Sequence, residues 1–63
     1  MKDTDIIKQM ITELLMEQGS LKLTMKNYNT LNKLTDEKMN WFLDQIEIRE
    51  ARISKLREIL KQI

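Results

Sequence analysis

Residues 39–63 carry apolar side chains at alternating spacings of three and four positions. Because an α-helix turns once in about 3.6 residues, such positions fall on one face of a helix. Repeated over several heptads, the spacing predicts a long helix with a coiled-coil-like seam. The seam positions are Met39, Phe42, Ile46, Arg49, Ile53, Leu56, Leu60 and Ile63, of which only Arg49 is polar.

The start of this long helix is marked by a capping signal at Thr35. A threonine side chain in this place accepts a hydrogen bond from a backbone N–H of the first turn. Asp36 and Glu37 follow it, and their negative charge suits the positive end of the helix dipole. No proline or glycine comes after Thr35, so the predicted helix covers residues 35–62.

A second apolar face runs through the amino-terminal part of the chain and predicts a helix over residues 3–18. Gly19, the only glycine, stands where this helix is expected to end, because glycine readily adopts the left-handed backbone of a helix terminus. Residues 21–32 again carry apolar side chains at helical spacing, but also several threonines and asparagines, which are poor helix formers. We expect a short and partly irregular second helix there.

The chain contains no proline and lacks the alternating pattern of β-strands, which predicts an all-α fold. We expect one small domain, residues 1–63, built as a helical hairpin or three-helix unit with a long carboxyl-terminal helix. That helix would span about 42 Å and the first helix only about 23 Å. The far end of the seam would then lack cover within the chain, which predicts an oligomeric bundle.

Self-association is the simplest way to bury the uncovered seam, since every copy carries the same apolar stripe. We expect a homodimer with antiparallel long helices, because residues 36–50 have a net charge of −3 and residues 51–63 a net charge of +3. Arg49 is either a device that sets the register of the seam or a side chain at its edge with the head group in water. The residues expected at this interface are Ile46, Arg49, Ile53, Leu56, Ile59, Leu60 and Ile63.

Composition argues against an enzyme and against a bound cofactor. The chain has neither histidine nor cysteine, so the commonest general base and the strongest nucleophile are missing. Asp44, Glu47 and Glu50 share a helical face but lack the loop geometry that surrounds calcium, and no metal site is expected. One glycine is too few for a phosphate-binding loop.

Charge and hydropathy favour a cytoplasmic protein that does not enter a membrane. Charged residues make up 33% of the chain, with a net charge of +1. No apolar run approaches the roughly 18 residues of a membrane span. The polar side of the long helix mixes acids with bases, which is not typical of a helix that lies on a membrane surface.

Residues 20–35 hold lysines and asparagines but no acidic residue. Such side chains contact phosphates and base edges in DNA complexes, and the segment has the layout of a helix-turn-helix. Against this interpretation, the helix that would enter the groove begins with Asp36 and Glu37. Trp41 lies off the seam and is a candidate interface anchor. The candidate partner surface consists of Lys22, Lys26, Asn29, Lys33 and Trp41.

These patterns predict a binding function and no catalysis. We expect a small regulator, inhibitor or assembly adaptor that associates with itself through its carboxyl-terminal helix and acts on another protein. A chain of this kind suits a phage or plasmid accessory protein. The alternative is a dimeric DNA-binding regulator of the helix-turn-helix type.

Overall fold

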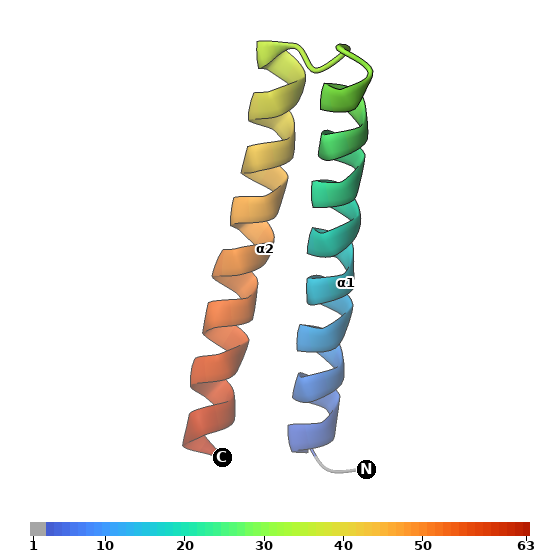
Figure 1. The fold of residues 1–63 in the computed structure, drawn as a ribbon. Coiled ribbons are helices and arrows are strands. Elements are labelled where there is room, and N and C mark those ends of the chain that lie inside the picture. The colour runs from blue at the N-terminus through green and yellow to red at the C-terminus, as the bar shows by residue number, and fades with distance from the viewer. Residues whose placement is uncertain (1–2) are drawn as a thin grey trace.

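The computed structural model describes residues 3–63, which form two antiparallel helices joined by a short turn (Figure 1). Helix α1 covers Asp3–Thr30 and helix α2 covers Asp36–Gln62. The molecule is a rod with extents of 46 × 16 × 11 Å. The all-α class and the long carboxyl-terminal helix are thus confirmed, and a helical hairpin describes the arrangement.

Gly19 does not end the first helix, and the helices expected over residues 3–18 and 21–32 are one continuous helix. The backbone of Gly19 is not left-handed. A glycine inside a helix costs about 1 kcal/mol relative to alanine, which the packing on either side of it offsets. The inner face of α1 keeps its spacing across this point, from Leu14 through Gln18 to Leu21.

The left-handed residue that ends α1 is Asn32, with a φ of 55°. The N–H of Lys33 donates to the carbonyl of Tyr28 at 2.9 Å, and the N–H of Asn32 donates to the carbonyl of Asn29 at 3.0 Å. These two bonds form a Schellman motif, which satisfies carbonyls that the helix end would leave open. Asparagine adopts this backbone more readily than most residues other than glycine, so it replaces glycine as the helix stop.

Helix α2 begins as the sequence predicts. Thr35 is the N-cap, with φ −81° and ψ 162°, and its side-chain oxygen accepts a hydrogen bond from the N–H of Lys38 at 3.2 Å. Asp36 and Glu37 lie in the first turn. The turn between the helices is therefore short and closed by a cap on each side.

The two helices pack along a single seam on each. Every described residue of α1 that is not exposed stands on one row with spacings of three and four, which is the spacing of an apolar face on a helix. On α2 the same holds for the predicted seam from Phe42 to Leu60, with Gln45 beside it. The α1 row is Thr4, Ile7, Ile11, Leu14, Gln18, Leu21, Met25 and Tyr28.

This packing corrects the expectation that the far end of α2 lacks cover within the chain. Helix α1 has 28 residues and α2 has 27, so the helices have nearly equal length. Ile53, near the expected start of the uncovered stretch, is only 4% exposed. The expected mismatch in length depended on a break at Gly19 that does not exist.

Aromatic side chains hold the helices together beside the turn. Tyr28 of α1 and Phe42 of α2 have ring centroids 5.9 Å apart. The Trp41 and Phe42 rings pack edge to face with their centroids 5.2 Å apart. The ammonium group of Lys38 lies 4.7 Å from the centroid of the Tyr28 ring. Such contacts add to area burial, so this end of the seam is well anchored.

Away from the seam the hairpin leaves much apolar surface uncovered. The buried apolar side chains among the described residues are Ile11, Phe42, Ile46 and Ile53, and none of them is completely enclosed. The accessible surface of 5207 Å² exceeds that of a compact monomer of this mass by about 900 Å². The large apolar residues left exposed are Ile6, Met10, Leu15, Met16, Leu23, Leu31, Met39, Trp41, Leu43, Ile48, Ile59 and Ile63.

Replacing Gly19 with alanine tests the continuity of α1. A β-carbon at this position meets nothing within 4 Å, and the substitution lowers the backbone entropy of the unfolded chain. We expect Gly19→Ala to raise the free energy of unfolding by about 0.5–1 kcal/mol, measured by urea titration followed by circular dichroism. A loss of stability would instead mean that Gly19 has the left-handed backbone of a helix end.

Candidate functional site

Arg49 lies at the middle of α2 and reaches across to α1. Its Nε donates to a carboxylate oxygen of Glu17 at 3.2 Å. Its Nη1 donates to the backbone carbonyl and the side-chain oxygen of Gln45 at 3.0 and 3.1 Å. The Arg49 side chain is 19% exposed, so its head group lies against protein acceptors instead of pointing into water. This arrangement supports the interpretation of Arg49 as a residue that sets the register of the seam.

Gln18 is a second polar residue on the seam, which the sequence did not single out. It is 6% exposed, and its amide nitrogen has no hydrogen-bond partner within the described residues. A buried donor without an acceptor costs about 1–3 kcal/mol. Gln18 and Arg49 both interrupt the apolar seam near the middle of the rod. Sliding one helix along the other would separate Arg49 from Glu17, whereas the Gln18 amide nitrogen has no partner to lose in residues 3–63. Of the two polar residues, only Arg49 has a side-chain contact there that favours this alignment.

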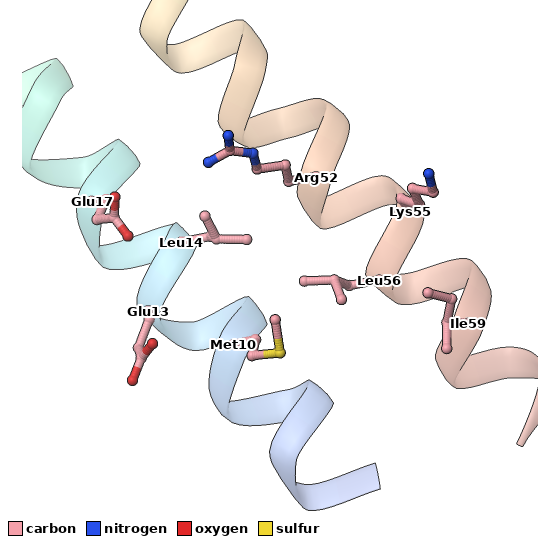
Figure 2. Close-up of a pocket in the computed structure, with 8 residues that line it drawn as sticks. All are labelled: Met10, Glu13, Leu14, Glu17, Arg52, Lys55, Leu56 and Ile59. Carbon is pink, nitrogen blue, oxygen red and sulfur yellow. The ribbon is translucent and has the colours of Figure 1, made fainter. Parts of the chain in front are cut away.

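One side of the hairpin carries a groove between the open ends of the two helices (Figure 2). Its volume is about 420 Å³. Leu14 and Leu56 point towards each other across the groove (Figure 2). The residues that line it are Met10, Glu13, Leu14 and Glu17 from α1 and Arg52, Lys55, Leu56 and Ile59 from α2.

A shallower hollow of about 570 Å³ continues this side towards the turn. Glu17 lines both the groove and the hollow, which places them on the same side of the hairpin. Trp41, Phe42 and Arg49 form the α2 wall of the hollow. We call the side formed by the groove and the hollow the groove face.

The charges of the groove are sorted by helix. Glu13 and Glu17 come from α1, whereas Arg52 and Lys55 come from α2. Among residues 3–63 the ion pair within 4 Å is the one between Arg49 and Glu17. Glu13, Arg52 and Lys55 therefore have no ion-pair partner in the described part of the chain and present their charge at the rim of an apolar groove.

The residues expected to carry self-association fall into two groups. Ile46 and Ile53 are buried in the hairpin, and Arg49, Leu56 and Leu60 are partly buried on its seam, so their main contacts are within the chain. Ile59 and Ile63 are exposed, and Ile59 lines the groove. The sequence reasoning missed the α1 wall of the groove, because the position of that wall follows only from a continuous α1.

The expected partner surface does not come together as one site. Lys22, Lys26 and Asn29 are exposed and share one face of α1, since they are spaced by four and three residues. Lys33 is exposed beside the turn. Trp41 is half exposed and lines the hollow of the groove face, which none of the other four residues lines.

Comparison of the chain with protein-family models, with curated proteins and with solved structures finds no match.

The described residues carry few other features that bear on function. Within residues 3–63, no three carboxylate, histidine or cysteine side chains gather as they would around a metal ion. Neither α1 nor α2 contains a stretch that is both long and apolar enough to cross a membrane.

A double-mutant cycle tests the link between Arg49 and Glu17. Glu17 is 52% exposed, so the pair is partly screened, and we expect Arg49→Met and Glu17→Gln to couple by about 0.5 kcal/mol in the free energy of unfolding. Glu13→Gln is the matched control, which should be additive with Arg49→Met. Additive effects for Glu17 as well would show that the guanidinium group lies in water.

Proposed function

We propose that this protein is a small non-enzymatic regulator, inhibitor or assembly adaptor, which acts through protein contacts and associates with itself through its groove face. The observation that carries the proposal is the amount of large apolar surface left exposed on a hairpin in which four apolar side chains are buried among residues 3–63. Exposed apolar patches rimmed by polar residues mark interaction sites.

The size of the uncovered surface supports self-association. A chain of about 60 residues is marginally stable alone, and small proteins without disulfides or metals are usually reinforced by oligomerisation. The excess of about 900 Å² over a compact monomer is close to the roughly 800 Å² that each partner buries in a stable interface. A second copy would therefore supply cover of the right extent.

The groove face is a better interface than the seam of α2, on which the sequence-based expectation rested. The seam is already used within the chain, whereas the groove offers apolar side chains from both helices and paired rows of opposite charge. Trp41 lies on this same face and would become part of the self-association surface. Tryptophan is enriched among residues that dominate interface energies.

A second protein would then bind to a surface of the hairpin that the self-association does not bury. Lys22, Lys26 and Asn29 form an exposed row on α1 that does not line the groove or the hollow. No acidic residue lies between residues 18 and 33, so this row favours an acidic partner surface, which it would attract and orient.

The alternative function in DNA binding has less support from the geometry. In a helix-turn-helix the second helix crosses the first at about 90–120°. Here α1 and α2 lie antiparallel over their length (Figure 1), and the row of Lys22, Lys26 and Asn29 belongs to the carboxyl-terminal third of α1. A helix presented in this way has no neighbour that would position it in a major groove.

Sedimentation equilibrium tests the self-association. We expect the protein to sediment at twice the chain mass of 7.6 kDa. Ile59→Lys, which places a charge in the groove, should weaken the dimer by at least about tenfold, since burying an isoleucine contributes about 1.5–3 kcal/mol. The matched control is Leu23→Lys, because Leu23 is also exposed but lines neither the groove nor the hollow. A wild-type protein of monomer mass would contradict the proposal.

Titration with duplex DNA separates the two functions. A protein that neutralises several DNA phosphates binds DNA with an affinity that falls steeply as the salt concentration rises. We expect this protein to show no such binding. The measurement is fluorescence anisotropy of a labelled duplex at two salt concentrations. A steep salt dependence that is lost in Lys22→Glu/Lys26→Glu would favour the DNA-binding function instead.

A further inference from the structure

We infer that the second copy docks on the groove face with its turn at the same end of the rod, so that α1 of each copy lies against α2 of the other. This arrangement rests on the proposed self-association and specifies its geometry. The twofold axis would run along the rod, between the two hairpins. Each of the four helices would then have antiparallel neighbours on both sides, as in an up-down four-helix bundle.

The charge along the chain alternates in four blocks. Residues 3–17 carry four acids and one base, a net charge of −3, and residues 18–33 carry three bases and no acid, a net charge of +3. Residues 36–50 and 51–63 repeat this order with −3 and +3. Because α1 and α2 are antiparallel (Figure 1), each negative block lies beside a positive block within the hairpin. A helix of a second copy that lies antiparallel to a helix of the hairpin, with its ends at the same height, also sets negative blocks beside positive blocks.

Two symmetric ways of pairing the groove faces of two copies place every negative charge block beside a positive one. In the first, the turns lie at the same end and α1 faces α2 of the other copy. In the second, the turns lie at opposite ends, and each helix faces its own counterpart. The second pairing contains the antiparallel α2 pair that the sequence alone favoured. The individual charges of the groove distinguish the two.

With the turns at the same end, residues that are level in one hairpin stay level across the interface. Glu13 and Glu17 line the same groove as Arg52 and Lys55. The two glutamates of each copy would therefore face the two bases of the other. Because of the twofold symmetry, this set of contacts would occur twice in the dimer. The apolar groove residues Met10 and Ile59 would meet in the same way and close the groove against water.

With the turns at opposite ends, like charges would meet at the centre. The midpoint of Asp3–Thr30 lies between residues 16 and 17, and the midpoint of Asp36–Gln62 is residue 49. Glu17 would then face its own copy, and Arg49 would do the same. Arg52 and Lys55 would lie level with residues 46 and 43. The α2 residues that line the hollow there, Trp41, Phe42 and Arg49, offer them no carboxylate partner. Like charges set against each other and charges buried without a partner both oppose association.

Disulfide trapping tests the arrangement, because the chain has no cysteine of its own. Met10→Cys and Ile59→Cys are made as separate single variants, mixed, and oxidised, and the products are identified by mass. We expect the mixed disulfide to form in preference to either disulfide between identical copies. Disulfides need α-carbons closer than about 7 Å, which the inferred pairing allows for these positions.

The matched pair is Met10→Cys with Thr24→Cys, which would meet if the turns lay at opposite ends. Faster trapping of that pair, in a protein that keeps the dimer mass, would overturn the arrangement and leave the proposed self-association intact. A monomer mass with neither disulfide would overturn both. The sedimenting mass therefore tests whether the protein associates with itself, and the disulfide preference tests how the two copies are arranged.

A charge exchange gives a second measurement that does not depend on oxidation. Glu13→Lys and Lys55→Glu should each weaken self-association by about tenfold, since each turns two attractive contacts into repulsive ones. An equimolar mixture of the two variants should recover the wild-type affinity, because the contacts are attractive again between unlike copies. Lys26→Glu, an equal change of charge outside the groove, is the control for net charge. A mixture that stays as weak as the separate variants would overturn the arrangement.

Discussion

Two helices that lie side by side bury only the faces they turn towards each other, and this limit governs the whole molecule. The contact between α1 and α2 uses one row of residues on each helix and leaves the remaining sides of both helices exposed. The core is therefore narrow, and most of the large apolar residues stay in contact with water. The hairpin thus closes along its seam but leaves most of its large apolar side chains without cover.

Arg49 makes the ion pair that links the two helices among the described residues. Leucine and isoleucine rows of equal spacing tolerate a shift by one heptad, whereas the hydrogen bond from Arg49 of α2 to Glu17 of α1 depends on the alignment of the two helices. Gln18, buried without a partner on the opposite helix, lowers stability at the same level of the rod. The Arg49–Glu17 contact favours the alignment that sets the level of the residues on the groove face, whereas the Gln18 amide nitrogen makes no hydrogen bond within residues 3–63 that would give it a part in that alignment.

The groove face follows from that alignment. Glutamates from α1 and bases from α2 flank apolar side chains in the groove. In the proposed dimer, rotation about the long axis of the rod would set the glutamates of each copy against the bases of the other. The exposed row of Lys22, Lys26 and Asn29, which lines neither the groove nor the hollow, would remain accessible in that dimer as the proposed surface for a partner.

The sequence by itself determined the helical class, the cap at Thr35, the span of α2 and the seam that α2 presents, because each of these depends on local spacing and on the first turn of a helix. It did not determine whether a helix continues through Gly19 or which residues cover the seam. A glycine inside a helix costs about as much as a single good contact provides, so only the packing of α1 against α2 decides whether the helix continues through it. Once it does, α1 reaches the length of α2, the seam from Phe42 to Leu60 is covered within the chain, and Met10 and Ile59 line the same groove. These are relations between residues far apart in the sequence, and only the tertiary structure brings them together.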